Sequence, residues 1–348
     1  MISVKNASLL NKKVLLRVDW NVPLSEAGRI IDDFRIRQSI KTIQFLIKSK
    51  KVSKIRIISH LGRPKGKGFE KDLSLKPIAS RFKKLVDFDI KNIEIFENIR
   101  FLAGEEKNSL NLAKKLAEDM DVFVNDALSV CHRSQASVVG VSKILPSYAG
   151  LQLEKEIELL NMLLKKPYPP FMVIIGGAKV EDKSETIKAL SKKADKILLG
   201  GMVANQILAS RNKQWLQNKK IYLPVDGILE SGERVEIHKI PRSEIKNIRD
   251  IGEETIERYL DYLSESRTVL IAGALGKFED YRFAKGTEKI IQFLAKSKSI
   301  STFGAGGDTL EKINKMRLGE DFTYLFSGGS ASLEYLSGKK LPGLEAFK

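Results

Sequence analysis

Polar and charged side chains follow the strand-like runs in the first half of the chain. They are arginine, histidine, aspartate and asparagine residues: Asp19, Asn21, His60, Arg63, Arg100 and Arg133. Arg35 opens the first predicted helix. Ligands of open α/β sheets bind beyond the carboxyl ends of the strands, and a guanidinium binds phosphate or carboxylate at two points. One such arginine alone would be interpreted as a surface salt bridge, but together they predict a pocket for a substrate with several negative charges.

Glycine pairs replace these charged residues in the second half. Each pair follows an apolar strand-like run, and all lie after residue 150: Gly176-Gly177, Gly200-Gly201, Gly306-Gly307 and Gly328-Gly329. Glycine lets backbone amides approach phosphate oxygens or a flat base closely, and a following helix adds a partial positive charge. A tight strand-to-helix turn would explain one pair but not four. Gly306-Gly307-Asp308-Thr309, before a predicted helix, is the best candidate for an anion cradle.

Two lysines and one aspartate accompany these glycines. Lys179 and Lys183 are four residues apart after Gly176-Gly177, which places both ammonium groups on one side of a helix start. Two like charges there indicate an anion between or beside them, although such a pair is usually just solvated. Asp308 is a candidate Mg²⁺ ligand, because such sites use one or two carboxylates and fill the rest with water and phosphate.

Other common site types are missing from the sequence. There is no P-loop, no complete G-x-G-x-x-G and no protein-kinase catalytic-loop triplet. The single cysteine, Cys131, cannot form an internal disulfide and is expected to be buried. The three histidines, His60, His132 and His238, show no metal-ligand spacing.

The alternation of short apolar runs with helical apolar spacing predicts an α/β fold. The predicted strands are 14–19, 55–60, 93–100, 122–127, 171–175, 197–199, 221–224, 269–271, 301–303 and 324–326. We expect two lobes, each an open, mainly parallel sheet flanked by helices, joined by a long interdomain helix with a hinge. Turn residues at 145–150 predict the boundary, which gives domains 1–150 and 151–336. The tail 337–348 is expected to pack back near the first domain.

Composition limits the function classes. The 348 residues are 43% hydrophobic and carry a net charge of +17, which fits a folded protein with an anionic partner. No apolar run is long enough for a membrane span, and the first residues lack a signal-peptide core, so we expect a cytoplasmic protein. Nucleic-acid binding would require arginines interleaved with aromatic residues on one face. With 7% aromatics and arginines at strand ends, it is the weakest hypothesis.

The chain resembles the phosphoglycerate kinase family along nearly its whole length. The motifs that carry the resemblance are 17–23 (RVDWNVP), 33–37 (DFRIR), 59–64 (SHLGRP), 97–101 (ENIRF), 124–127 (VNDA), 132–135 (HRSQ), 176–180 (GGAKV), Lys183, 276–279 (GKFE), 283–287 (FAKGT), 306–309 (GGDT) and 331–334 (ASLE). Gln135 and 201–205 (GMVAN) are similar to archaeal members of the family.

The resemblance implies reversible phosphoryl transfer between 1,3-bisphosphoglycerate and ADP, giving 3-phosphoglycerate and ATP. The implied phosphoglycerate pocket consists of Asp19, Asn21, Arg35, His60, Leu61, Gly62, Arg63, Arg100 and Arg133. The implied nucleotide site consists of Gly176, Gly177, Lys179, Lys183, Gly200, Gly201, Glu279, Gly306, Gly307, Asp308 and Thr309, with Glu279 at the ribose and Asp308 at Mg²⁺. Arg35 and Lys179 would stabilise the transferred group while the lobes close. The family also implies a monomer that binds neither nucleic acid nor membranes.

The nucleotide half departs from the family pattern at four positions. Ala272 and Ala274 replace the asparagine and proline of an Asn-Gly-Pro triplet, Ala305 replaces the first glycine of Gly-Gly-Gly-Asp, and Ser330 replaces a glycine of a later triplet. The lost asparagine normally reaches the nucleotide phosphates. A pseudoenzyme that keeps the fold but has lost turnover is therefore the alternative hypothesis.

Overall fold

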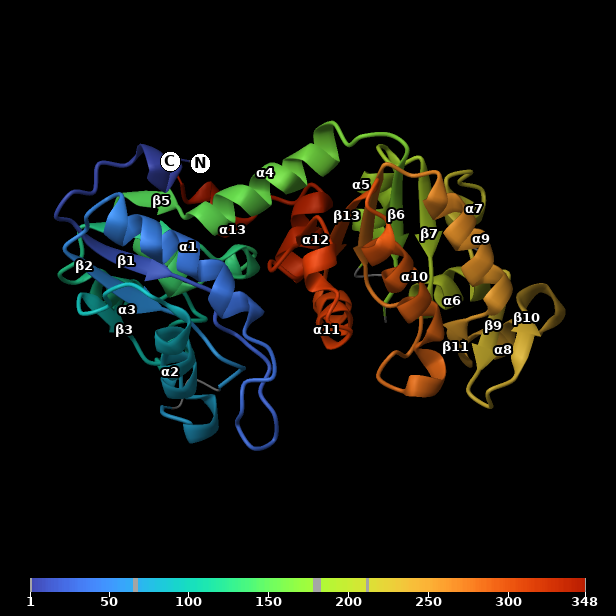
Figure 1. Ribbon diagram of the computed structural model, residues 1–348, viewed down its shortest axis with the longest axis horizontal. Coiled ribbons are helices and arrows are strands. Elements are labelled where there is room, and N and C mark those ends of the chain that lie inside the picture. Colours follow the sequence, from blue (N-terminus) through green and yellow to red (C-terminus); the bar gives the residue numbers. More distant parts are fainter. Residues whose placement is uncertain (1, 65–67, 178–182, 211–212, 348) are drawn as a thin grey trace. The chain divides into compact units, whose positions relative to one another are not determined.

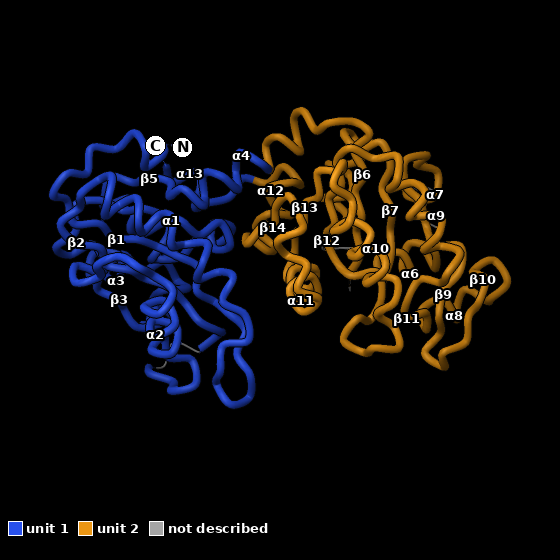
Figure 2. Tube along the Cα trace, viewed as in Figure 1, with its two compact units in different colours: residues 1–159, 340–348 blue, residues 160–339 orange. Residues whose placement is uncertain are grey.

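The computed structural model describes residues 2–64, 68–177, 183–210 and 213–347. The chain forms two compact units: unit 1 comprises residues 1–159 and 340–348, and unit 2 comprises residues 160–339 (Figure 2). The division falls inside helix α4 (Leu151–Lys165) rather than at the turn residues before it. Helix α13 (Pro342–Glu345) belongs to unit 1, where the Gly343 N–H donates to the Cys131 carbonyl over 2.8 Å.

Unit 1 is built around a parallel sheet with the strand order β3-β2-β1-β4-β5 (Figure 1). The strands are β1 (Lys13–Arg17), β2 (Lys54–Ile58), β3 (Ile93–Ile95), β4 (Val122–Asn125) and β5 (Ser147–Ala149). The sequence placed only turn residues at β5. Tertiary pairing made it a strand, because Ser147, Tyr148 and Ala149 pair in register with Phe123, Val124 and Asn125 of β4.

Helices cover both faces of this sheet, which explains its nearly continuous apolar strands. Val14 and Leu16 pack in one core with residues of α1 (Phe34–Lys48) and α2 (Lys76–Leu85), whereas Leu15 and Phe123 pack in another core with α3 (Leu110–Ala117). A five-residue π-helix, Ala136–Gly140, contacts α3. Beyond the carboxyl ends of β1 and β2 the chain carries the polar residues Asp19, Asn21, Ser59 and His60 among these core residues.

Unit 2 contains a six-stranded parallel sheet with the order β14-β13-β12-β6-β7-β8. Its strands are β6 (Phe171–Ile175), β7 (Lys196–Leu199), β8 (Ile221–Tyr222), β12 (Thr268–Ala272), β13 (Ser301–Ala305) and β14 (Tyr324–Leu325). The helices are α5 (Ser184–Ser191), α6 (Gly201–Ala209), α7 (Lys213–Leu216), α8 (Arg242–Ile245), α9 (Glu253–Ser264), α10 (Lys285–Lys296), α11 (Gly307–Lys315) and α12 (Ser330–Leu336). Every strand of this sheet was anticipated from its apolar run.

A second, antiparallel sheet in unit 2 was not anticipated. Its order is β10-β9-β11, from β9 (Asp226–Leu229), β10 (Arg234–Glu236) and β11 (Ile248–Ile251). These strands are short and rich in charged residues, so their pattern resembles a loop. They are held by a small core that includes Ile237, Ile245 and Ile248.

Among the described residues, no helix has both the length and the apolarity needed to cross a bilayer.

Candidate functional site

A buried arginine ends strand β1 in unit 1. Arg17 is fully buried, and its Nη1 donates to the Val18 carbonyl over 2.7 Å. Its Nη2 lies 3.1 Å from Nδ1 of His60, which follows β2. Since guanidinium nitrogens only donate, Nδ1 of His60 accepts and the imidazole is neutral in this arrangement. The sequence analysis did not select Arg17; its signal was a charged residue at the end of an otherwise apolar strand.

The charges around His60 reinforce that neutral state. Burial lowers the pKa of His60 well below its ordinary value, and the positive charges of Arg17, Arg100, Arg35 and Arg133 lower it further. The four guanidiniums therefore act on one point at the carboxyl ends of β1, β2 and their neighbours. Positive charge concentrated in this way favours an anionic ligand.

The loop after β1 is ordered by its own side chains. Asp19 accepts from the Asn21 N–H over 3.0 Å with one oxygen and pairs with Arg35 through the other. The Asn21 side chain in turn accepts from the Gly62 N–H over 2.8 Å, which ties the β1 loop to the β2 loop. Burial lowers the pKa of Arg35, and the charge of Glu156 opposes that shift.

Gly62 also holds Arg100, because Nη1 of Arg100 donates to its carbonyl over 2.6 Å. Burial lowers the pKa of Arg100 to about 10, and the nearby Arg17 contributes to the shift. Leu61 is buried, and its carbonyl accepts from the Asn98 side chain over 2.8 Å. Arg63 is exposed. Arg100 is thus fixed by the backbone, whereas Arg63 projects outward.

The buried carboxylate of Glu105 holds the segment that follows Arg133. Glu105 accepts from the N–H and the hydroxyl of Ser137 over 3.0 and 2.5 Å. Burial raises the pKa of Glu105, and Arg17 has the opposite effect. Arg133 precedes this segment, and its Nε lies 3.2 Å from Nε2 of His132. The sequence analysis missed Glu105 because nothing local distinguishes it from a surface glutamate.

The glycines after β6 and β7 in unit 2 serve packing between backbones. A Cβ on Gly176 would lie 1.9 Å from the Ala274 carbonyl oxygen, and one on Gly201 would lie 2.9 Å from the same atom. The N–H groups of Gly176, Gly177, Gly200 and Gly201 donate to carbonyls of Ala272, Ala274, Ile175 and Leu275. These amides are therefore not available to phosphate oxygens, contrary to the reason for which the sequence analysis selected them.

The glycines at the start of α11 are open instead. Gly306 has φ +92°, and a Cβ on Gly307 would meet no described atom within 4 Å. The first N–H groups of an α-helix have no partner inside the helix, so this end of α11 suits an anion. Thr309 differs: it is buried, and its hydroxyl accepts from the Gly273 N–H over 2.7 Å. Its side chain therefore joins α11 to the loop after β12.

Three charged side chains gather at the start of α11. Loss of hydration raises the pKa of Asp308, the charge of Glu279 raises it further, and Lys183 has the opposite effect. Exposed Asp308 and Glu279 thus repel one another, and a bound cation would relieve that repulsion. The described residues contain no group of three or more His, Cys, Asp or Glu that could hold a metal.

Three further features of unit 2 concern the predicted nucleotide residues. Lys179 lies outside the described residues, so its predicted role receives no structural account. A cavity of about 380 Å³ is lined by residues of α5 together with Trp215, Asn218 and Ser337, and includes none of the predicted nucleotide residues. Ala272, Ala274 and Ala305 are buried at the carboxyl ends of β12 and β13.

Comparisons with known proteins agree on one family. The family model described as phosphoglycerate kinase matches residues 4–217 and 212–339. The phosphoglycerate kinase of Coprothermobacter proteolyticus is 38% identical over 386 residues, covering 98% of this chain and 97% of its own. That of Borreliella burgdorferi is 36% identical over 390 residues, covering 98% of each.

Solved structures give the same result. The phosphoglycerate kinase from Coxiella burnetii has a TM-score of 0.83 and 33% identity, covering 99% of this chain and 98% of its own. The one from Pyrococcus horikoshii has a TM-score of 0.82 and 29% identity, covering 100% and 98%. The likeness therefore extends over both units.

Proposed function

The chain belongs to the phosphoglycerate kinase family, and we propose that it catalyses reversible phosphoryl transfer between 1,3-bisphosphoglycerate and ADP, giving 3-phosphoglycerate and ATP. The observation that carries the proposal is the group of four arginines acting on a neutral His60 at one sheet edge of unit 1. Such a pocket matches a substrate that carries phosphate and carboxylate groups. Full-length similarity to relatives of this activity supports the same assignment.

In this proposal, unit 1 binds the phosphoglycerate. Arg35, Arg63, Arg100 and Arg133 bind its anionic groups, and neutral His60 offers an Nε2–H donor because Nδ1 accepts from Arg17. The remaining pocket residues are Asp19, Asn21, Leu61 and Gly62, of which Asn21 and Gly62 keep the two strand-end loops together. A bidentate guanidinium discriminates in favour of planar or tetrahedral oxyanions.

Unit 2 binds the nucleotide in this proposal. Gly306, Gly307 and the first turn of α11 face the phosphates, Lys183 adds a positive charge, and Glu279 contacts the ribose. Gly176, Gly177, Gly200 and Gly201 shape the adjacent surface through their close backbone packing. Asp308 would hold Mg²⁺ together with the nucleotide phosphates. When bound, that ion supplies charge neutralisation at the phosphate oxygens.

The chemistry requires positioning and charge stabilisation more than a covalent partner. Arg35 and Lys179 would neutralise the charge that develops on the oxygens of the transferred group, as would the N–H groups at the start of α11. Because the two substrates bind to different units, transfer requires that both be brought in line in a ternary complex. Exclusion of water at that stage prevents hydrolysis of the acyl phosphate.

We also propose the cellular setting that the family implies. The protein works as a cytoplasmic monomer whose partners are the small-molecule substrates, without nucleic acid or membrane. The net charge of +17 then attracts anionic metabolites rather than nucleic acids.

A coupled assay of ATP consumption with 3-phosphoglycerate and Mg²⁺ tests the proposal. The native chain and Ala272→Asn are compared, because Ala272 stands where the family has a phosphate-contacting asparagine. Turnover of the native chain supports the kinase assignment. Turnover only after Ala272→Asn indicates a pseudoenzyme, and silence of both folded proteins refutes the assignment.

The role of Lys179 is tested in the same assay. Lys179→Ala should abolish turnover, because the charge on the transferred group loses its partner, while calorimetry should show phosphoglycerate binding largely intact. Lys166→Ala, at an exposed lysine just after α4, serves as the charge-matched control. Near-normal turnover of Lys179→Ala would remove this lysine from the mechanism.

A further inference from the structure

The loop between β12 and α10 carries Glu279, the residue proposed above at the ribose. The part of this loop that carries Glu279 runs from Gly276 to Ala284, up to the start of α10, and turns through a short 3-10 helix, Tyr281–Phe283. Phe278 packs with Ala274 and Ala284 at its base. The Glu279 carboxylate itself is exposed, so its position depends on how the two ends of the loop are held.

Three hydrogen bonds from outside the loop hold its ends. The Leu275 N–H, just before the loop, donates to the Thr287 hydroxyl over 3.0 Å. The Lys277 N–H donates to the Arg249 carbonyl over 2.7 Å, and the Gly286 N–H donates to the Asp250 carboxylate over 2.9 Å. Two of these three bonds come from β11, a strand of the small antiparallel sheet.

Asp250 fits this place closely. It is buried, and its other oxygen accepts from the Ile251 N–H over 2.9 Å. A Cβ on Gly276 would lie 2.3 Å from the Asp250 carboxylate, and one on Gly286 would lie 2.6 Å from it. Both ends of the loop are therefore glycine where they pass the carboxylate, and neither end tolerates a side chain.

We propose that Asp250 is a positioning residue for nucleotide binding, which acts by fixing both ends of the loop that presents Glu279. This inference rests on the proposed function, because it takes Glu279 to contact the nucleotide. In this inference the small antiparallel sheet anchors the nucleotide loop, because β11 carries the Asp250 side chain and the Arg249 carbonyl that bind it. Loss of the Asp250 carboxylate should weaken nucleotide binding without changing phosphoglycerate binding.

The ionised carboxylate is the form that suits both N–H donors. It offers an acceptor oxygen to each, whereas the protonated form carries a hydrogen that needs an acceptor of its own. Burial, together with the charge of Glu288, raises the pKa of Asp250 to about 7, and the charge of Lys285 has the opposite effect. The two bonds to backbone N–H groups also oppose the shift.

The charges facing Asp250 are themselves paired. Glu288 on α10 binds Lys312 of α11 over 2.6 Å, and Lys285 on α10 pairs with Glu253 of α9. Asp226 of β9 lies against Gly252, where an added Cβ would be 2.2 Å from its carboxylate, and pairs with Arg234 over 2.8 Å. The charged neighbours of Asp250 therefore have partners of their own. Protonation of Asp250 below about pH 7 removes the form that suits both N–H donors, so the affinity for the nucleotide should fall.

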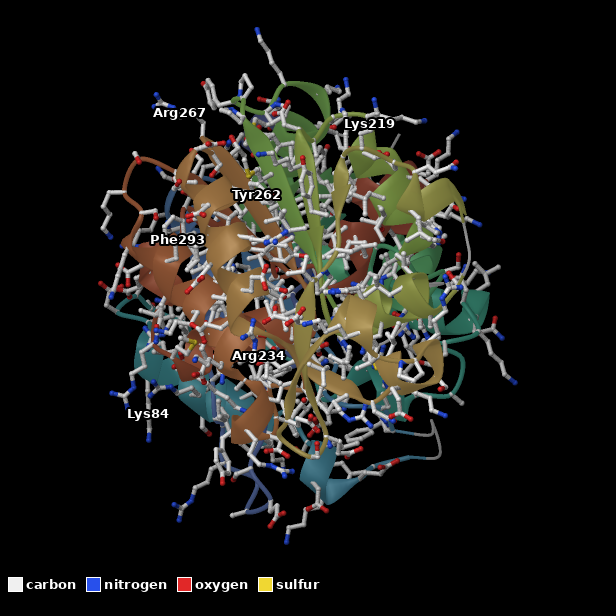
Figure 3. All side chains as sticks on the ribbon, turned by 90° about the vertical axis from the view of Figure 1, so that its right-hand side faces the viewer. Lys84, Lys219, Arg234, Tyr262, Arg267 and Phe293 are labelled. Atoms are coloured by element: carbon white, nitrogen blue, oxygen red, sulfur yellow. The ribbon has the colours of Figure 1, made fainter. Side chains whose placement is uncertain are left out.

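Asp226 provides a matched control in the same small sheet. It is fully buried, accepts from the Thr255 and Glu254 N–H groups at the start of α9, and pairs with Arg234 over 2.8 Å. Figure 3 labels Arg234. Asp226 thus accepts from backbone N–H groups as Asp250 does, but its partners lie on α9 and β10 rather than at the nucleotide loop.

Calorimetric titration of the full-length chain with Mg-ADP tests the inference. In Asp250→Asn the amide can replace only one of the two acceptors, so the dissociation constant for ADP should rise by about five- to 150-fold, the range for leaving one buried donor unpaired. Gly276→Ala should raise the dissociation constant for ADP by a similar factor, because the added methyl group would displace the loop from the Asp250 carboxylate. Asp226→Asn should lower thermal stability but leave the ADP constant unchanged.

The pH profile separates positioning from a general structural effect. Wild-type affinity for ADP should fall between pH 8 and pH 6, whereas Asp250→Asn should stay weak and nearly flat. Unchanged ADP affinity in Asp250→Asn and Gly276→Ala, or an equal loss in Asp226→Asn, would overturn the inference, and so would a wild type that does not bind ADP. The coupled assay of the wild type judges the kinase function separately, because it does not depend on either variant.

Discussion

Thr309→Val removes one hydrogen-bond acceptor from unit 2 with almost no change in shape. The Thr309 hydroxyl accepts from the Gly273 N–H over 2.7 Å, and Thr309 is only 1% exposed. Valine fills the same volume, so no cavity forms, but the Gly273 N–H loses its partner. An unsatisfied buried donor costs about 1–3 kcal/mol. We therefore expect the free energy of unfolding of unit 2 to fall by that amount.

The two tryptophans allow this to be measured unit by unit. Trp20 is in unit 1 and Trp215 is in unit 2, and the chain has no other tryptophan. In a Trp20→Phe background, urea unfolding followed by fluorescence reports on unit 2. With a slope of about 2 kcal/mol per molar urea, Thr309→Val should lower the midpoint by about 0.5–1.5 M.

The complementary background completes the test. With Trp215→Phe, the signal comes from Trp20, and the midpoint of unit 1 should not move on Thr309→Val. An unchanged unit 2 midpoint would show that the hydroxyl does not stabilise the link between α11 and the β12 loop. A shift of equal size in both units would show that they unfold together, and the assignment to one unit would fail.

Three further predictions concern unit 1. His60, which accepts from Arg17, should remain neutral at pH 6.5 in a histidine NMR titration, where an ordinary histidine is half protonated; a normal titration would contradict the burial and charge argument. Burial raises the pKa of Asp126 to about 7, so the contribution of Asp126 to the free energy of unfolding is complete below about pH 4 and is lost as the pH rises to 7. Relative to Asp126→Asn, the free energy of unfolding of the wild type, measured in urea, should fall by up to about 4 kcal/mol over this range. A difference between the two proteins that stays constant with pH would refute this prediction. Gly62→Ala forces a side chain into a backbone with φ +61° and places its Cβ 2.6 Å from Leu73. The free energy of unfolding of unit 1 should therefore fall by about 1–2 kcal/mol, and the KM for phosphoglycerate should rise. A variant with unchanged stability and KM would show that this loop can rearrange freely.

Local pattern predicted most of the parallel strands and their helices. Alternating apolar runs and helical stripes are properties of consecutive residues, so the sequence alone determined the α/β class. It failed for β5, where Ser147–Ala149 resembles a turn, and for the small sheet that contains Asp226 and Asp250. Short polar strands are stabilised by partners distant in sequence, and no local pattern shows those partners.

The candidate site divides in a similar way. The arginines at strand ends were predicted because the carboxyl edge of a parallel sheet gathers whatever follows each strand. Arg17 and Glu105 were missed because their roles depend on His60 and on Ser137, which come from other elements. The same limit applies to Thr309, whose buried hydroxyl holds Gly273.

The glycine pairs show most clearly what each level decides. In the sequence, Gly176-Gly177 and Gly306-Gly307 share one context, because each pair follows a strand-like run, and both pairs were selected as phosphate-binding candidates. In the folded chain the amides of the first pair donate to Ala272 and Ala274, while the second pair opens at the start of α11. A sequence determines where the backbone can bend, because that is a property of each residue. Tertiary structure decides what the exposed amide meets, because the neighbouring backbone comes from a different strand.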